Sequence, residues 1–491
     1  MRDCYLIQNH VSQCQQSGCI GFEYSVCEVT SLMFFDPRDL LLKEKITLYN
    51  NIAESGDCRG RLLAELQVYP SPQITWEFES LGASACEPTR SQTIPRKLEN
   101  PLAGSWFSID EQPYVSGERQ SNIGTPTILL KGVAPRAYYG DVDVPLHSFK
   151  FYLPNARFQG TSLEGQEFLE TTVRAGGKRM SGGTGGRRLD VPLDDEWNIS
   201  LMTERDALDW LAPTQNNIGT LITTRGQLYP IDEDNGGKDK FPTLTMTEAQ
   251  RRLGTLSVLL SFANGGYLGP VYIEGMRNGE IAAAIVAYHT TPLELFGNSW
   301  LTGASDLAAY LKCFSALDKM LNTTPWNEAF HLILVWYLQA IQRQNMQLGK
   351  HWTVVANAVG AALERLSYTI LVEELQEIDV RDWKNSRKYP ARKRIERLLE
   401  KIGLTTKSPA YGDIGFVKDF VDIRNDATHA RSTLTLTNDM RNQIMSLAIQ
   451  WVEETLLWRL GYDGGYCSRR LFHPQPILQP RYDLNTREAN W

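Results

Sequence analysis

The chain has 491 residues, of which 42% are hydrophobic and 22% charged, and its formal net charge is −7. This length predicts about two or three domains, and the acidic balance argues against a protein coated with nucleic acid while leaving room for a local basic site. No apolar run reaches the ~18 residues of a membrane-spanning helix, and the N-terminus lacks the layout of a secretory signal. We therefore expect a cytoplasmic protein without a membrane contact.

Five of the eight cysteines lie before residue 60: Cys4, Cys14, Cys19, Cys27 and Cys58. They include no Cys-x2-Cys pair, and His10 is the only histidine near them. Reduced thiols are the preferred interpretation, and a zinc-dependent nucleic-acid binder is the weaker alternative. We therefore expect no metal and no cofactor.

The first half of the chain alternates short strand-like runs with Gly and Pro. Gln73–Phe78, Phe149–Leu153 and Thr220–Thr224 are examples, and they predict a β-rich N-terminal domain over residues 1–240, built as a sandwich or a barrel. A Gly-rich basic stretch, Arg174–Arg188, lacks the P-loop spacing. It is typical of a solvated linker, and a loop that contacts phosphate is the alternative.

A polar stretch at Asp232–Asp239 marks a predicted boundary, and residues 241–304 form a connecting segment of mixed structure. Ala249–Phe262 is predicted as an amphipathic helix that the Gly-rich stretch Gly265–Pro270 ends. Ile281–Tyr288, with the apolar run before it, fits a hairpin or a short helix, and the sequence leaves both open.

Residues 305–491 are predicted to be mainly helical. The expected helices are Asp306–Met320, Asn327–Arg343, Val354–Glu377, Ala391–Ile402, Asp413–His429 and Asn438–Leu460, with Gly461 as the C-terminal cap of the last. The predicted fold class is therefore α+β, with a β-rich N-terminal domain before an all-α C-terminal bundle.

The most informative helix is the one that ends at His429. Val417, Phe420 and Val421 form an apolar stripe at helical spacing, and Arg424 continues that stripe. A guanidinium is costly to bury without a partner, so Arg424 needs a reason to be there. His429 follows five residues later and can exchange a proton near neutral pH.

This pattern resembles the Arg-x4-6-His signature of the HEPN ribonucleases, in which a polar residue such as Asn425 often follows the arginine. The resemblance implies a compact helical bundle that dimerises and cuts RNA without a metal. The overall layout, including the helix with Leu259–Phe262, resembles the ApeA-like group, which is linked to bacterial anti-phage defence by abortive infection. It implies that the N-terminal domain senses a trigger, such as a phage component, or restrains the nuclease.

In the catalytic interpretation, the 2′-hydroxyl of the RNA attacks the adjacent phosphorus, and DNA should resist cleavage. His429 transfers a proton, and Arg424 stabilises the charge on the phosphoryl oxygens. Asn425 holds His429 or contacts a phosphate, or else forms a hydrogen bond at the helix end. Glu364 is placed where some relatives carry an acidic partner for the arginine; the alternative is an exposed helix charge. Asp426 is expected to be a solvated carboxylate.

Five residues on an ideal helix separate Arg424 and His429 by about 140°, so one helix face cannot aim both at one phosphate. Either the helix loosens near Thr428, or the site is composite. We therefore expect a homodimer with an isologous interface along Asp413–His429.

A basic cluster lies between Arg381 and Arg397, with Trp383 and Tyr389 interleaved. We expect it to guide RNA through the residues Lys384, Arg387, Lys388, Arg392, Lys393 and Arg394; a solvated face neutralised by the preceding acids is the alternative. The leading hypothesis is thus a metal-independent endoribonuclease that cuts tRNA or another RNA. The competing one is a non-catalytic HEPN scaffold that binds RNA or nucleotide and dimerises, with Arg424 and His429 structural.

Overall fold

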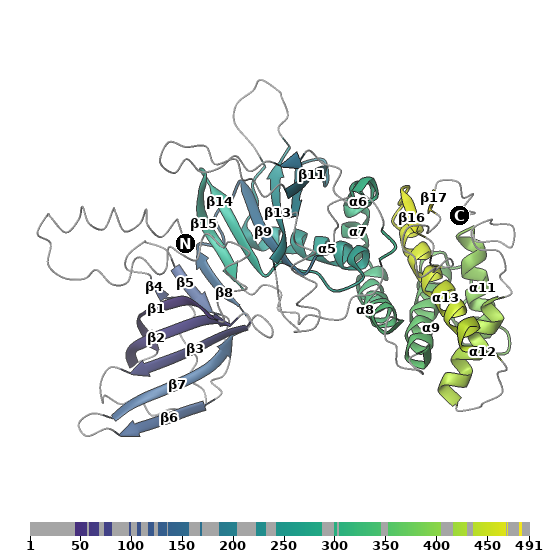
Figure 1. Cartoon of the computed structure of the whole chain (residues 1–491), viewed down its shortest axis with the longest axis horizontal. Helices are drawn as coiled ribbons and strands as arrows, with labels where there is room; N and C mark the ends of the chain where they lie inside the picture. Colours follow the sequence, from purple (N-terminus) through teal and green to yellow (C-terminus); the bar gives the residue numbers. More distant parts are fainter. Residues whose placement is uncertain are drawn as a thin grey trace, which may run out of the picture. The chain divides into compact units, whose positions relative to one another are not determined.

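The computed structural model describes residues 45–55, 58–67, 73–80, 98–99, 106–109, 116–121, 126–134, 136–156, 167–168, 186–203, 222–231, 242–286, 299–301, 304–344, 352–403, 416–429, 436–467, 469 and 481–483. The chain divides into two compact units (Figure 1). The first comprises Met1–Gln67 and Ile74–Ala134, and the second comprises Val68–Gln73 and Pro135–Trp491.

The first unit contains a five-stranded sheet in the order β1-β2-β3-β7-β6. Its strands are β1 (Lys45–Ser55), β2 (Cys58–Gln67), β3 (Gln73–Ser80), β6 (Ser116–Ser121) and β7 (Pro126–Ala134), and a short pair joins β4 (Leu98–Glu99) to β5 (Trp106–Ile109). Ile74 and Trp76 are buried in β3, as are Leu62 and Ala64 in β2. This period-two burial confirms the strand predicted at Gln73–Phe78.

The second unit begins with an antiparallel sheet in the order β10-β11-β12-β13-β9-β14-β15-β8. Its strands are β8 (Ala137–Gly140), β9 (Ser148–Pro154), β10 (Glu167–Phe168), β11 (Gly186–Pro192), β12 (Trp197–Thr203), β13 (Ile222–Pro230), β14 (Tyr272–Arg277) and β15 (Glu280–Val286). Side chains on one face, such as Phe151, Ile199 and Ile273, are buried and share one hydrophobic core with helix α5 (Met246–Asn264). Strand alternation therefore turns a second set of side chains to the opposite face.

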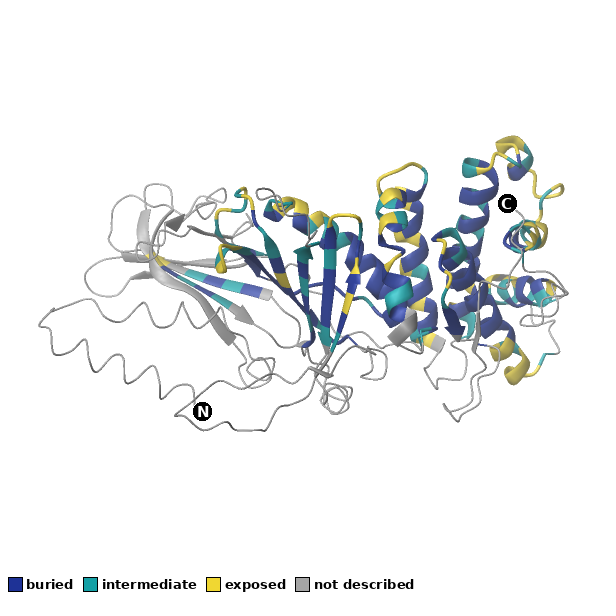
Figure 2. Ribbon diagram, turned by 90° about the horizontal axis from the view of Figure 1, so that it is seen from above, coloured by how far each residue is buried: buried dark blue, intermediate teal, exposed yellow. Residues whose placement is uncertain are grey.

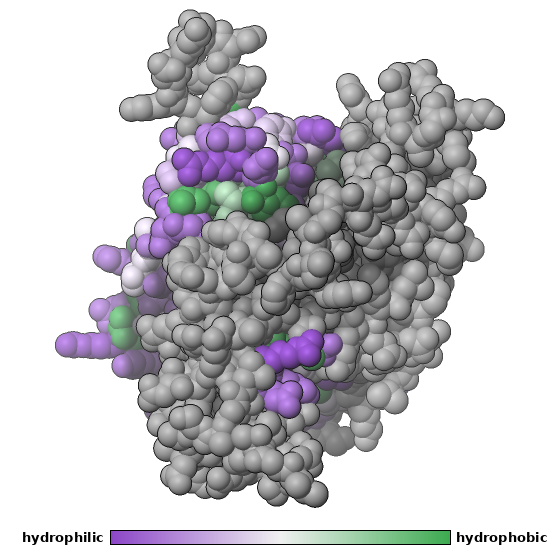
Figure 3. All heavy atoms as spheres, turned by 90° about the vertical axis from the view of Figure 1, so that its left-hand side faces the viewer, coloured by the Kyte–Doolittle hydropathy of each residue, from purple (hydrophilic) through white to green (hydrophobic). Residues whose placement is uncertain are grey.

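That opposite face carries mainly polar side chains in register across five strands. Asp190 pairs with Ser200, Ser200 with Gln227, Gln227 with Lys150, and Lys150 with Glu274. Period-two alternation thus separates an apolar face covered by α5 from a polar one, as expected for an antiparallel sheet. Viewed from the left-hand side of Figure 1, the described residues at the surface are mostly hydrophilic, with small hydrophobic groups among them (Figure 3).

Strands β14 and β15 form the hairpin that the sequence left undecided. Arg277 pairs with Glu280, and the two residues between them, Asn278 and Gly279, have φ values of 55° and 83°. Two successive positive φ angles are the geometry of a type I′ turn, which favours the sequence Asn-Gly. The short-helix alternative for Ile281–Tyr288 is therefore excluded over the described part, which ends at Val286.

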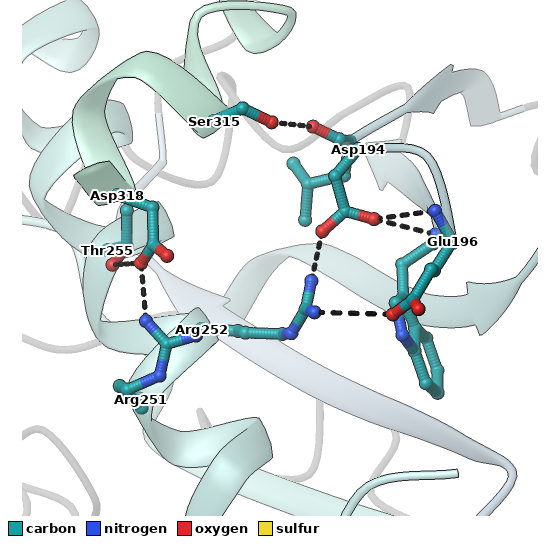
Figure 4. A network of polar contacts seen from close by, with 9 residues as sticks. Asp194, Glu196, Arg251, Arg252, Thr255, Ser315 and Asp318 are labelled. Atoms are coloured by element: carbon teal, nitrogen blue, oxygen red, sulfur yellow. Dashed lines mark hydrogen bonds and ion pairs between the residues drawn. The ribbon is translucent and has the colours of Figure 1, made fainter. Parts of the chain in front are cut away.

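Two neighbouring arginines of α5 connect the sheet to the helices (Figure 4). Arg252 donates to Asp194, in the turn between β11 and β12, and lies 3.8 Å from Glu196. Arg251 donates to Asp318 at 2.6 Å, and Thr255 donates to the same carboxylate oxygen at 2.8 Å. Asp318 belongs to helix α7 (Phe314–Leu321), so α5 is held by polar contacts at the sheet turn and at the bundle.

The helical region follows the predicted series with three differences. Its helices are α6 (Ala304–Leu311), α7, α8 (Trp326–Gln344), α9 (Trp352–Tyr368), α10 (Val380–Lys384), α11 (Ala391–Lys401), α12 (Phe416–His429) and α13 (Asn438–Arg459), and β16 (Gly465–Cys467) pairs with β17 (Arg481–Asp483). A break at Cys313 divides the predicted Asp306–Met320 helix, α9 continues as a π-helix over Thr369–Glu374, and α10 was not predicted. Gly461 has a φ of 70° and ends α13 as predicted.

The α+β class is confirmed at the coarse level, because a β-rich region precedes a helical one. The predicted boundary at residue 240 nevertheless lies inside the second compact unit. The reason is physical: α5 buries Leu253, Leu256 and Leu260 in one core that holds both sheet residues and bundle residues. Figure 2 shows this buried layer running from the strands into the helices.

An ion pair lies in the core of the helical region. Glu453 of α13 is fully buried and Arg469 is 4% exposed. Arg469 donates through Nη2 at 2.6 Å and through Nε at 2.9 Å, and the hydroxyls of Tyr337 and Tyr466 donate to the same carboxylate. The Glu453 charge raises the pKa of the Arg469 guanidinium against the effect of burial, and the pair fastens the C-terminal segment to α8 and α13.

Glu274 gives a prediction about pH. Burial raises the pKa of its carboxyl from 4.5 to about 7, although Lys150 attracts the carboxylate and lowers it. Because the folded chain keeps this proton up to a higher pH than the unfolded chain, the free energy of unfolding should fall between pH 4.5 and pH 7 by about 3 kcal/mol. Glu274→Gln should remove this slope and stabilise the protein at pH 8.

Chemical denaturation of both proteins at pH 5 and pH 8 measures this difference. Glu280→Gln is the matched control, since Glu280 is exposed at the end of the same hairpin. A wild-type slope that persists in Glu274→Gln would assign the pH dependence to another group.

Candidate functional site

Helix α12 brings the predicted motif to the surface of the bundle. Val417, Phe420 and Ile423 are buried, which fixes one side of the helix against its neighbours α9 and α13. The helix stays regular as far as His429. The alternative that the helix loosens near Thr428 is therefore wrong, and the angular separation of residues 424 and 429 stands.

Arg424 takes part in a chain of three charged side chains. Its Nη2 donates to Oε2 of Glu364 at 3.3 Å, and Nη1 of Arg394 donates to Oε1 of the same carboxylate at 2.9 Å. The side chains of Arg424 and Glu364 are 30% and 40% exposed, whereas that of Arg394 is 11% exposed. Glu364 is thus the acidic partner of the motif arginine, and the interpretation as an isolated exposed charge is wrong.

Gly360 lets Arg424 lie close to helix α9. A Cβ atom at this position would be 2.9 Å from both Cδ and Nε of Arg424. Gly360 and Val421 line, with the three charged residues, a cavity of about 10 Å³, close to the minimum for one water molecule. A phosphate therefore cannot enter between Arg424 and Glu364, and any substrate must meet Arg424 from its exposed side.

The remaining motif residues divide between two helix faces. Thr428, one turn after Arg424, donates to Oδ1 of Asn357 at 3.0 Å and to the Arg424 carbonyl at 2.8 Å. Asn425 is exposed, and residue 429 follows it by one helical turn. The His429 side chain lies outside the described residues.

Asp426 differs from its predicted role as a solvated carboxylate. The residue is only partly exposed, and its Oδ1 is buried without a hydrogen-bond partner among the described residues. A buried carboxylate oxygen without a partner is costly.

The basic cluster is divided in the structure. Arg394 is removed from the RNA-binding set, because it pairs with Glu364 and its guanidinium lies 4.2 Å from the centre of the Trp383 ring. Lys388 pairs with Asp382, and Arg392 pairs with Glu396. Lys384, Arg387 and Lys393 are exposed and form no ion pair with a described residue.

The two aromatic residues of the cluster also differ from expectation. Trp383 is 7% exposed and packs edge-on against Tyr368, so it cannot stack on a base. Tyr389 is partly exposed and lies 4.6 Å from the Lys393 ammonium, in a cation–π contact. Of the predicted RNA-binding residues, Lys384, Arg387 and Lys393 thus remain exposed without an ion pair to a described residue, beside the partly exposed Tyr389.

Sequence reasoning missed the contributions of Gly360, Asn357 and Arg394 to this site. Gly360 could have been found, since a glycine inside a helix costs about 1 kcal/mol and suggests a close approach of another group. Asn357, Gly360 and Glu364 also repeat at helical spacing on one face of α9. Nothing local in the sequence separates Arg394 from the cations around it.

The described residues include no group of His, Cys, Asp or Glu that could hold a metal ion. Cys4, Cys14, Cys19 and Cys27, on which the zinc alternative depends, lie outside the described part of the chain. None of the described helices is both long and apolar enough to cross a membrane.

Residues 323–475 match the family model of the YopA C-terminal domain. The match includes α8 to α13, and with them the Arg424–Glu364–Arg394 chain and the buried Glu453–Arg469 pair. This description names neither HEPN nor ApeA-like proteins, so the HEPN resemblance stays a prediction. No curated protein and no solved structure matches the chain.

The close approach of Gly360 gives a second prediction. Gly360→Ala should displace the Arg424 guanidinium from Glu364 and lower any activity of Arg424 about tenfold or more, since small displacements of a charge-stabilising group have large effects on rate. The melting temperature should change little, because alanine gains about 1 kcal/mol of helix propensity that offsets the crowding.

Ala361→Ser, on the adjacent position of α9, is the control and should leave the rate unchanged. The measurement is the cleavage rate and the thermal unfolding of both variants. An unaltered rate in Gly360→Ala would show that the cleavage rate does not depend on the position of Arg424.

Proposed function

We propose that this chain is a metal-independent endoribonuclease of the HEPN type that cuts RNA, such as a tRNA, in bacterial anti-phage defence by abortive infection. The observation that carries the proposal is Arg424, a partly exposed guanidinium that Glu364 orients near the end of an unbroken helix. A cation on such a rigid element costs little reorganisation when negative charge develops beside it.

In the proposed reaction the 2′-oxygen of the RNA attacks the adjacent phosphorus, and the bond from phosphorus to the 5′-oxygen breaks. His429 takes the proton from the 2′-hydroxyl or returns one to the leaving 5′-oxygen. Arg424 stabilises the charge on the phosphoryl oxygens, and Asn425 positions His429 from one helical turn away. The products are a 2′,3′-cyclic phosphate and a free 5′-hydroxyl.

We place the complete site across a two-fold dimer. Since α12 is regular through His429, Arg424 and His429 of one copy lie on different faces. Two copies packed along α12 would bring Arg424 of one toward His429 of the other. Lys384, Arg387 and Lys393 would then guide the RNA backbone, and the N-terminal unit would receive the activating trigger.

The second candidate function is a non-catalytic scaffold that binds RNA or nucleotide and dimerises. The observation in its favour is the Arg424–Glu364 ion pair itself, because a cation already bound to a carboxylate can be purely structural.

The deciding experiment incubates the full chain with total cellular RNA or single-stranded DNA, in EDTA, beside Arg424→Ala and His429→Ala. We expect cleavage of RNA alone, fragments that end in a cyclic phosphate, and loss of cleavage in both variants. If a wild-type dimer, mixed with RNA and the extract of phage-infected cells, still cuts nothing, the scaffold is the better description. Cleavage that persists in both variants would place the site elsewhere.

A further inference from the structure

The polar face of the sheet in the second unit holds a pocket of about 460 Å³ that the proposed nuclease reaction does not use. A volume of this size is within the range of small-molecule sites, ~300–1,000 Å³. The residues that line it include Arg188 of β11, Gln227 and Tyr229 of β13, His147 before β9, and Asn278 of the β14–β15 turn. Side chains that lie far apart in the sequence thus converge on one space.

The pocket has rigid walls. Gln227 and Tyr229 are held in β13 between two paired strands. Asn278 occupies the tight type I′ turn, and the His147 backbone amide donates to the Met276 carbonyl at 2.9 Å. Walls built on paired strands lose little conformational freedom when a ligand binds, which favours affinity.

Asp190 orients the guanidinium of Arg188 and the phenol of Tyr229 in this pocket. Nε of Arg188 donates to Asp190 at 2.9 Å, and the Tyr229 hydroxyl donates to the same carboxylate at 3.2 Å. Burial and the Asp190 charge raise the pKa of the Tyr229 phenol, so it stays protonated at neutral pH. Because Asp190 binds Nε, the terminal nitrogens Nη1 and Nη2 of Arg188 remain to donate hydrogen bonds to an oxyanion of the ligand.

The lining combines three kinds of group. Arg188 and the imidazole of His147 suit a phosphate or another oxyanion. The Tyr229 ring and Pro230 offer a flat apolar surface on which a base can stack. Gln227 and Asn278 carry amides that both donate and accept, as the edge of a nucleobase requires.

We propose that this pocket binds a small nucleotide, with its phosphate at Arg188 and its base against Tyr229. The site is separate from Arg424, and the proposal does not depend on the chain being a nuclease. A nucleotide bound to the sheet would also stabilise the folded chain by linkage, since only the folded chain presents these five side chains together.

The test is isothermal titration of the full chain with AMP, GMP, UMP and a cyclic mononucleotide, beside adenosine and inorganic phosphate. At least one nucleotide should bind, and Arg188→Gln and Gln227→Ala should each weaken it about tenfold or more. Arg277→Gln is the matched control: Arg277 is exposed in β14 near the same turn but does not line the pocket. Adenosine should bind more weakly than AMP.

Three results would overturn the proposal: no binding of any nucleotide at millimolar concentration, binding that survives both pocket variants, or inorganic phosphate that binds as tightly as every nucleotide. Because Arg188 pairs with a partly exposed carboxylate, thermal unfolding of each variant should match the wild type. Binding is read without a cleavage assay, so failure here leaves the proposed nuclease untouched.

Discussion

Glu453→Gln should lower the free energy of unfolding by about 3–5 kcal/mol, because it leaves the Arg469 guanidinium buried without its counter-charge. The new amide can still accept a hydrogen bond, but its NH₂ group competes with the hydroxyls of Tyr337 and Tyr466, which now donate to the carboxylate. Desolvated donors without an acceptor add to the cost. Equilibrium denaturation with urea, followed by circular dichroism, measures the change.

Glu400→Gln is the matched control. Glu400 is 49% exposed and pairs with Arg397 on the surface of α11, so its substitution should change stability by no more than ~1 kcal/mol. If both substitutions had similarly small effects, the buried pair would contribute little to the fold. A second variant, Glu453→Leu with Arg469→Leu, removes both charges together. It should restore the part of the loss that comes from the unpaired guanidinium, while the hydroxyls of Tyr337 and Tyr466 still lack this acceptor.

Arg424→Ala should reduce RNA cleavage by about 10²–10³-fold, the usual cost of removing one donor that stabilises a developing oxyanion. Its effect on stability should stay near 1 kcal/mol, since the side chain is 30% exposed and its ion pair is accessible to water. Single-turnover cleavage and chemical denaturation of the same preparation provide the two values. Arg392→Ala, which breaks a surface pair with Glu396, should change neither by much.

The two proposed functions predict opposite patterns for Arg424. For a purely structural arginine, Arg424→Ala should leave the rate per folded molecule unchanged, since any lower activity would come only from unfolded chain. Glu364→Gln adds a discriminating readout, because it loosens Arg424 without removing it. For a catalytic arginine, this variant should lose about tenfold in rate, and combining it with Arg424→Ala should cause no further loss.

The sequence predicted most helices of the second unit, because their apolar residues repeat at helical spacing. The HEPN resemblance suggested Glu364 as an acidic partner of Arg424, beside the preferred alternative of an exposed helix charge, and the structure contains this contact. The sequence did not predict that Arg394 also pairs with the Glu364 carboxylate. The eight cations from Arg381 to Arg397 are indistinguishable in the sequence, and only the fold shows that Arg394 is largely buried. The predicted boundary near residue 240 lies within the second compact unit for a related reason: a polar loop resembles a linker whether or not the helix after it packs back on the sheet.

The Gly-rich basic stretch Arg174–Arg188 is a second case in which the local sequence did not predict the position of a cation. Its last residues, Gly186–Arg188, begin strand β11, and Arg188 lines the pocket on the polar face. The alternation of a strand explains why Arg188 faces that pocket while Leu189 enters the core. No local pattern could show this, because the pairing partners in β12 and β13 follow after intervening loops.

Helix α5 also determines how the protein can be divided into fragments. Phe262, near its end, packs against the rings of Trp300, Tyr310 and Tyr337, all of them buried. A fragment that begins at residue 323, where the family match starts, would retain Tyr337 and lose the other three rings. The matched region is therefore not an independent folding unit in this chain. A soluble fragment that contains Arg424 has to begin before the sheet, at about residue 135, rather than at the edge of the matched region.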